Sequence, residues 1–379
     1  MAPGEESPPG LVEVATQWGH IGVVGFGGPP AHIALLRDLC VGRRRWMSPR
    51  EFEDAIAAAN LLPGPASTQL AIFSAWWVRG TAGALVGGLA FVLPGLLLIV
   101  ALAALFLAGS PPAWIAGAGA GAGAAVAAVA VRAGLDLAGD ELRRVGRPLA
   151  YAVLGAVAAA LVGPWLVLVL LVCGVVELTW SGALRRVAAA LPAPVLAVAG
   201  SGGLAALAWT AFKVGALSYG GGFVIIPMMQ GDAVEQHGWM TGGEFLNAVA
   251  LGQVTPGPVV HTVAAVGYAA AGVGGAALAA AVAFAPSFAL VTIGAGHFDA
   301  LRASRPVKAF LAGAGPAAVG AILGAAVPLA LALDETWQLA VMAAAAAALL
   351  MARRGVVETL LAAGATGAAL GLLGAPLPA

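Results

Sequence analysis

Two Pro-Gly-Pro motifs, each following a short apolar stretch, point most directly to anion chemistry. They are Pro63-Gly64-Pro65 and Pro256-Gly257-Pro258. Proline sacrifices no hydrogen bond in the first turn of a helix, and glycine lets an oxyanion approach the backbone. A helix that starts inside a membrane points free N–H groups and a partial positive charge at whatever precedes it. We expect each motif to precede such a helix start, and Gly27-Gly28 and Gly220-Gly221-Gly222 to provide two more. The alternative is that these motifs are kinks satisfied by neighbouring helices.

Several polar side chains near these breaks have the donors that an oxyanion requires. The candidates are Asn60, Gln253, Ser67, Thr68, Thr255 and Arg37. The two amides each lie three residues before a Pro-Gly-Pro motif and carry N–H donors, although they could also cap helix ends. Hydroxyls in membrane helices more often bond their own backbone. The guanidinium of Arg37 is either a fork-shaped oxyanion ligand or a member of a cytoplasmic basic cluster.

Lys213 is the second type of candidate, because it stands in an apolar segment, Leu204–Ser218, that contains no acidic residue. A lysine deep in a membrane helix costs roughly 2.5–3.5 kcal/mol, so a lysine kept there is usually functional. The alternative is a side chain that snorkels to the membrane interface. His20 lies 193 residues earlier, at the equivalent position of the sequence repeat described below. We expect the two residues to flank one anion site, with His20 supplying a charge that switches with pH.

The elements that position these residues must lie in a membrane. Hydrophobic residues make up 61% of the 379 residues and charged residues 9%. Soluble chains have about 45–50% apolar and about 25% charged residues, so a water-soluble enzyme is excluded. Eighteen Lys+Arg balance eighteen Asp+Glu, which leaves no basic excess for nucleic acid. The two cysteines make neither a disulfide framework nor a metal site, and no cofactor motif is present.

The spans must be helical, because unpaired backbone groups in lipid cost several kcal/mol each. We expect them at Ala84–Ala108, Trp114–Val131, Leu149–Val162, Pro164–Trp180, Gly274–Gly296, Ala309–Leu333, Trp337–Met351 and Val356–Leu373. Small residues in the run Ala116–Val129 predict close helix packing. Leu11–Phe26 and Phe52–Leu62 fall short of the roughly 20 residues that cross a bilayer, and they predict broken or re-entrant helices. The total is roughly 10–13 spans.

The sequence repeats itself at an offset of 193 residues. This offset aligns Gly27-Gly28 with Gly220-Gly221 and the first Pro-Gly-Pro motif with the second. It also aligns Ser48 and Glu51 with Thr241 and Glu244, which predict two capping boxes. The chain therefore divides into an N-terminal repeat (1–180), a linker (181–204) and a C-terminal repeat (205–379).

Charge predicts that the two repeats have opposite orientations, since basic residues mark cytoplasmic loops. Arg43-Arg44-Arg45 is basic, whereas its counterpart Gln236-His237-Gly238 has no lysine or arginine. Ser110–Ala113 is uncharged, whereas Arg302–Lys308 is basic. The expected fold is an all-α polytopic membrane protein with two inverted-topology repeats and broken helices. This arrangement is typical of secondary transporters with a midplane site.

Long motifs in both halves resemble the chromate ion transporter family in its two-domain form. In the first half they are Gly25–Leu35 and Asn60–Thr68, and in the second half Tyr219–Phe223 and Gly252–Val259. The resemblance covers nearly the whole chain. It implies export of chromate across the bacterial inner membrane, which gives chromate resistance.

The sequence contains no P-loop, so transport must use an ion gradient or exchange, as in an antiporter. The expected partners are chromate or sulfate, the lipid bilayer, a proton or an exchanged anion as counter-ion, and a second copy in a homodimer. A transporter for sulfate or another oxyanion is the first alternative, and an anion channel is the second. A membrane-embedded enzyme finds no support, because no catalytic cluster occurs in the spans.

Overall fold

The computed structural model describes residues 9–107, 111–139, 146–161, 163–182, 203–218, 223–294 and 303–378, and all regular structure in them is helical. The first half contains α1 (Leu11–Val24), α2 (Pro29–Arg37), η1 (Asp38–Arg43), α3 (Pro49–Leu61), α4 (Ala66–Phe106), α5 (Ala113–Ala124), α6 (Val126–Ala138), α7 (Arg147–Leu161), η2 (Gly163–Trp165) and α8 (Leu166–Trp180). The second half contains α10 (Leu204–Leu217), α11 (Ile225–Gln230), η3 (Gly231–Gln236), α12 (Gly242–Val254), η4 (Val259–His261), α13 (Thr262–Gly294), α15 (Arg305–Leu331), α16 (Thr336–Ala346), η6 (Ala347–Met351) and α17 (Val356–Leu372).

Each apolar stretch that was expected to span the membrane corresponds to a helix in the described residues. Most of the expected linker lies outside them. Four helical stretches are long and apolar enough to cross a bilayer, namely α4, Ala113–Ala138, Val259–Gly294 and α15. The chain is therefore a multi-pass membrane protein.

The two halves repeat the same local structure at the offset found in the sequence. The π-helices η1 and η3 begin at Asp38 and Gly231, 193 residues apart, and α3 and α12 keep the same offset. Both predicted capping boxes are present. The Ser48 hydroxyl accepts from Glu51 N–H, and the Thr241 hydroxyl accepts from Glu244 N–H, each at 3.2 Å.

The long helices α4 and α13 each fold back on themselves. Gly80 and Gly272 have φ of 61° and 60°, a conformation that favours glycine. In α4 a Cβ on Gly88 would lie 2.9 Å from the Ile72 side chain, although a straight helix would separate these residues by roughly 24 Å. Each helix therefore has a short arm and a long arm. The short arm Ala66–Arg79 is roughly 20 Å long, too short to cross the hydrocarbon core, so it is re-entrant.

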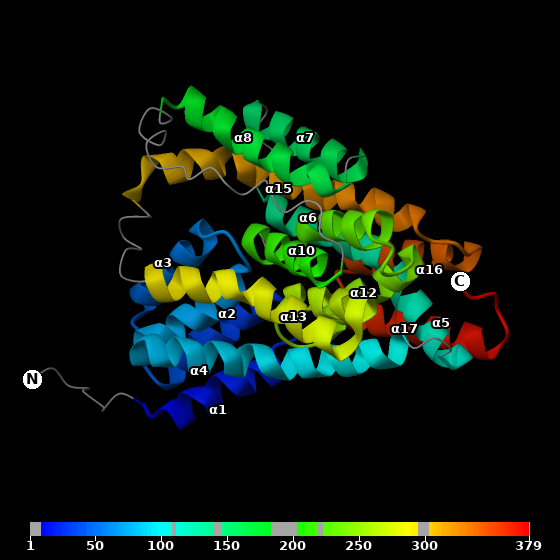
Figure 1. Cartoon of the computed structure of the whole chain (residues 1–379), viewed down its shortest axis with the longest axis horizontal. Helices are drawn as coiled ribbons and strands as arrows, with labels where there is room; N and C mark the ends of the chain where they lie inside the picture. Colours follow the sequence, from blue (N-terminus) through cyan, green and yellow to red (C-terminus); the bar gives the residue numbers. More distant parts are fainter. Residues whose placement is uncertain are drawn as a thin grey trace, which may run out of the picture.

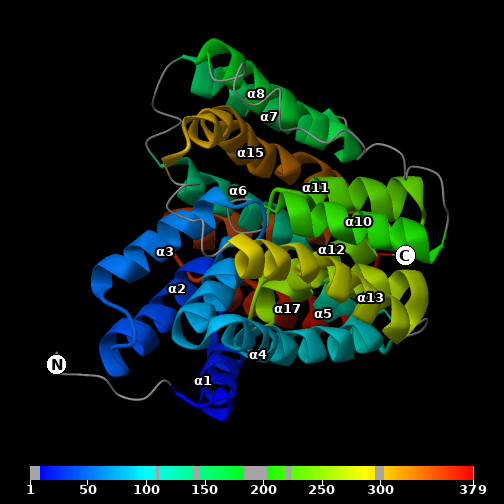
Figure 2. The same cartoon turned by 60° about the vertical axis from the view of Figure 1, so that its left-hand side comes forward.

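The halves run in opposite directions and are interleaved. In Figure 1, α4 passes from blue to cyan in one direction, while its equivalent α13 lies beside it and runs the other way. The last helices of each half pack against the other half: α7 and α8 cover α15, and α17 lies along α5. Figure 2 shows the same layering from another side, with α8 and α7 outermost above α15. The predicted inverted arrangement is confirmed.

Glycines set the closest approach between the halves. Gly117 and Gly121 of α5 face Gly367 and Gly371 of α17, and a Cβ at Gly367 would collide with the Gly117 carbonyl. Small residues at four-residue spacing let membrane helices pack with backbones in contact. The prediction of close packing for the Ala116–Val129 run is therefore confirmed.

Candidate functional site

Both Pro-Gly-Pro motifs precede helix starts in the membrane region, as the sequence predicts. Pro65 is the N-cap of α4, and Pro258 is the N-cap of the short helix η4 that leads into α13. Gly28, with φ 73°, is the N-cap of α2. The fourth predicted start, Gly220-Gly221-Gly222, lies outside the described residues.

The first break is held by its own half and by the other half. Gly64 has φ 126°, and the Gln69 amide donates to the Pro63 carbonyl at 2.7 Å. A Cβ on Gly64 would lie 3.1 Å from the hydroxyl oxygen of Ser287, which follows Pro286 in the long arm of α13. The first break therefore packs against the residue that follows Pro286 in the opposite repeat.

The second break mirrors this contact. Gly257 has φ 93°, and its N–H donates across the repeats to the Gly25 carbonyl at 3.0 Å. Gly95, which follows Pro94 in the long arm of α4, lies against the Pro256 carbonyl with no room for a Cβ. The two broken helices therefore meet at the interface between the inverted repeats.

Two fully buried histidines support the second break. His32 Nε2 lies 2.9 Å from the Gly25 carbonyl, and Nδ1 lies 3.2 Å from the Ser67 hydroxyl. Because a carbonyl only accepts, Nε2 of neutral His32 carries the proton and Nδ1 accepts from Ser67. The rings of His32 and His261 meet Phe91 and Phe284 edge-on. For His32 this geometry matches a packed, neutral histidine.

Near the breaks, several buried donors have no hydrogen-bond partner among the described residues. They are Thr68 Oγ1, Gln253 Nε2 and Ser287 Oγ. Thr255 instead bonds its own helix, donating to the Leu251 carbonyl at 2.8 Å. Unpaired buried polar groups cost free energy, so these donors are candidates to bind a ligand. Ser287 was not among the residues singled out as ligands from the sequence.

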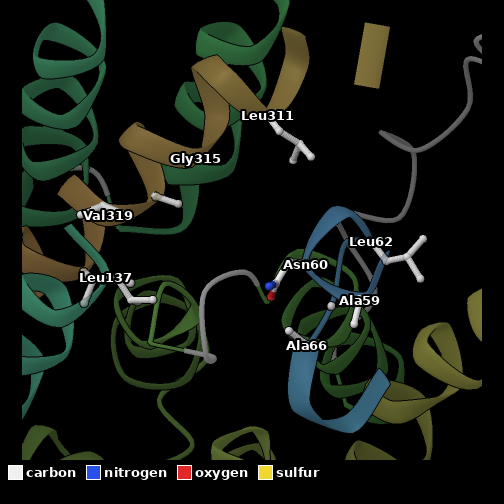
Figure 3. Close-up of a pocket in the computed structure, with 11 residues that line it drawn as sticks. Ala59, Asn60, Leu62, Ala66, Leu137, Leu311, Gly315 and Val319 are labelled. Carbon is white, nitrogen blue, oxygen red and sulfur yellow. The ribbon is translucent and has the colours of Figure 1, made fainter. Parts of the chain in front are cut away.

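Asn60 is exposed, unlike its equivalent Gln253, and lines a cavity of about 270 Å³. In Figure 3 its amide points into the space between the first break and α15. Opposite it lie Leu311, Gly315 and Val319 of α15. None of the eleven lining residues is charged, and Asn60 alone has a polar side chain. The cavity reaches the first break at Gly64, and no cationic side chain lines it.

Lys213 lies on α10 and forms a buried ion pair with Asp232 at the start of η3. The Thr210 hydroxyl donates to the same carboxylate oxygen at 2.9 Å. The side chains of Lys213 and Asp232 are 15% and 1% exposed. Asp232 was missed as a partner because it lies outside the segment of Lys213, Leu204–Ser218. The signal that could have found it is that Asp232 is the first carboxylate after the apolar stretch 223–229.

Two of the expected site residues, His20 and Arg37, lie on the exposed surface of the described residues. His20 is exposed on α1, and α4 and α13 lie between α1 and α10 (Figure 1). His20 is thus exposed where Lys213 is buried, and the two repeats place these equivalent positions on opposite sides of the α4–α13 pair. Arg37 forms an exposed ion pair with Glu53 at 3.2 Å, which places it in the basic cluster and not at the breaks.

The fold and the site together define a class of protein. Two inverted repeats, re-entrant arms and broken helices that meet at the repeat interface are the architecture of a secondary transporter. The chain is therefore a membrane transporter and not an enzyme.

Comparisons with known proteins identify the family. The sequence profile described as chromate transporter matches the chain twice, at residues 12–178 and 205–372. The chromate transport protein of Cupriavidus metallidurans is 32% identical, over 94% of this chain and 91% of the relative. The chromate transport protein of Pseudomonas aeruginosa is 32% identical, over 82% of this chain and 78% of the relative. No solved structure matches the chain. The chain belongs to the chromate transporter family.

Proposed function

We propose that this protein exports chromate from the bacterial cytoplasm across the inner membrane and thereby gives chromate resistance. The relatives named chromate transport protein support chromate as the substrate. We place the binding site at the two Pro-Gly-Pro breaks, with Lys213 as its permanent positive charge.

The burial of Lys213 carries the proposal. Its side chain is 15% exposed, whereas the arginines in ion pairs are 32% to 63% exposed. Lys213 precedes the end of α10, at Leu217, by four residues, which is roughly 6 Å along the helix. The Gly220-Gly221-Gly222 motif follows in the sequence. A buried cation can attract a dianion to the site that we propose.

The unpartnered donors supply the rest of the binding chemistry. The hydroxyls of Thr68 and Ser287 and the Gln253 amide come from both repeats. Tetrahedral oxyanions accept hydrogen bonds from several directions, so donors from two repeats suit them. Donors of this kind recognise shape and charge, and sulfate is therefore the natural competitor. The interior-negative potential favours the exit of a dianion by roughly 2.3 kcal/mol per charge per 100 mV.

Chromate accumulation and growth measured in cells test the proposal directly. A chromate-sensitive bacterium that expresses the protein should accumulate less chromate and grow at higher chromate concentrations than the same strain with an empty vector. Lys213→Ala should abolish both effects. Lys308→Ala is the matched control, because Lys308 is the other lysine of the chain and lies exposed on α15. Equal accumulation with and without the wild-type protein, at confirmed membrane expression, would refute chromate export.

A further inference from the structure

The ion pair between Lys213 and Asp232 is present in one repeat only. The equivalents of these residues in the first repeat, 193 positions earlier, are His20 and Leu39. Leu39 is fully buried, like Asp232. The repeat therefore offers an internal control for what the carboxylate contributes to the fold.

The first repeat shows that the local fold does not need the ion pair. In η1 the Arg44 N–H bonds the Leu39 carbonyl, and in η3 the His237 N–H bonds the Asp232 carbonyl, both at 3.0 Å. The same π-helix thus forms around a leucine and around an aspartate. Buried ion pairs can often be replaced by apolar residues without loss of stability, so their retention calls for another explanation.

The two oxygens of the Asp232 carboxylate have different surroundings. Lys213 Nζ and Thr210 Oγ1 both bind Asp232 Oδ2. Asp232 Oδ1 is buried and has no partner among the described residues. In this state Asp232 neutralises Lys213, the positive charge that an incoming anion requires.

From this geometry we propose that Asp232 is the proton-binding site of the transporter and that it competes with the substrate for Lys213. The inference rests on the proposed function above and names its coupling ion. When the oxyanion binds the Lys213 ammonium, the Asp232 carboxylate loses its counter-charge and faces a second anion. It then takes up one proton from the side on which the anion enters.

Anion and proton therefore bind together and cross together. A deprotonated Asp232 restores the ion pair and closes the anion site. A dianion that leaves with one proton still carries a net negative charge, so the interior-negative potential continues to favour its exit.

The charged surroundings of Asp232 leave Lys213 as its main partner. Among the described elements packed against η3, α10 carries Lys213, whereas α11 and η2 carry no titratable group. Glu244 of α12 is engaged in the capping box at Thr241. On η3 itself, Glu235 is exposed, and the following His237 stacks on Trp239.

The test uses full-length protein in liposomes that contain a trapped pH indicator. At alkaline pH chromate is the dianion, so a proton that enters with it must be carried by the protein. An inward chromate gradient should acidify the lumen with one proton per chromate. Asp232→Asn should transport chromate without acidification and with a rate that no longer depends on pH.

Thr210→Val provides a variant that retains both charges. The substitution removes the Thr210 hydroxyl and with it a hydrogen bond that favours the ionised form of Asp232. The pH at which transport declines should therefore move upward. A purely structural threonine would leave the pH profile in place. Glu235→Gln, on the exposed side of η3, is the control and should leave proton movement unchanged.

A second measurement needs no variant. If one proton binds with the anion, the affinity of the wild-type protein for chromate in detergent should fall as the pH rises, by about tenfold per pH unit where the free protein has lost that proton. Chromate transport without proton movement, or an affinity that does not change with pH, would overturn the inference and leave the proposed function standing. No chromate transport under any gradient would instead refute the proposed function.

Discussion

Lys213 is not an isolated cation in the structure, because the carboxylate of Asp232 pairs with it. From the sequence alone Lys213 is an isolated membrane cation. In the structure it forms an ion pair with Asp232, and the Thr210 hydroxyl donates to the same carboxylate oxygen. The pairing could not be predicted, because it joins two elements whose contact depends on how α10 packs against η3. The role of Lys213 as a buried cation was predictable from its cost in an apolar segment.

At Lys213 the type of cation should matter less than its presence. Lys213→Arg keeps the charge and should retain part of the chromate transport, since the larger planar guanidinium fits the ammonium site imperfectly. Rates are measured in reconstituted liposomes and normalised to correctly inserted protein. Full wild-type rates in a charge-free Lys213→Gln protein would contradict the role of the charge.

The first repeat suggests a variant that separates folding from transport. Lys213→Met combined with Asp232→Leu replaces the buried pair with apolar residues and should unfold at the wild-type temperature or above, because no buried charge is left unpaired. The same protein should not transport chromate. Asp232→Leu alone is the contrasting variant, and it should lose about 3–5 kcal/mol because Lys213 remains unpaired. Thermal unfolding in detergent measures both, and a strongly destabilised double variant would show that the pair is structural.

Among the elements, helix starts were predictable and folded-back helices were not. Pro-Gly-Pro and the Ser48 and Thr241 capping boxes are local signals, and each gives a helix start in the structure. Gly80 and Gly272 reverse α4 and α13 inside apolar runs. There a glycine is equally compatible with close packing, so nothing in the sequence distinguishes a turn from a straight helix.

The contact between the second break and Gly95, in the long arm of α4, should be sensitive to side-chain volume. Gly95→Ala places a Cβ against the Pro256 carbonyl and 2.8 Å from the His261 ring. Such overpacking should cost about 1–3 kcal/mol of unfolding free energy and slow transport. Gly274→Ala on α13 is the control, because a Cβ there has no neighbour within 4 Å. Equal thermal stability of the two variants would show that the contact is loose.

The capping boxes should stabilise without contributing to transport. Thr241→Ala removes the hydroxyl that accepts from Glu244 N–H and should cost about 1 kcal/mol. Ser48→Ala should behave alike, because its box has the same geometry. Unfolding in detergent and transport per folded protein are the two readouts. A transport defect larger than the loss of folded protein would assign these helix starts to the transport cycle.

At the scale of the whole molecule, the inverted repeats follow from the sequence, but their interleaving does not. Paired motifs and opposite loop charges predicted two halves in opposite orientations. The exchange of α8 and α17 between halves arises from glycine contacts such as Gly174 with Phe310 and Gly117 with Gly367. Glycines in apolar helices do not reveal which partner they face.

Accessibility labelling tests the orientation. Arg44→Cys and His237→Cys occupy equivalent positions after η1 and η3, so membrane-impermeant reagents should label them from opposite sides of the membrane. The native Cys40 and Cys173 are both buried and provide little background. Labelling of both introduced cysteines from the same side would rule out inversion.

On the proposal made above, the buried cation Lys213 is required for oxyanion transport. Its most direct test is the uptake of labelled chromate into inverted inner-membrane vesicles, with unlabelled sulfate as competitor and wild-type and Lys213→Ala proteins at equal abundance. The wild-type protein should take up chromate in a way that sulfate reduces, and Lys213→Ala should give no uptake above that of empty vesicles. Near-normal uptake by a correctly inserted Lys213→Ala protein would contradict it.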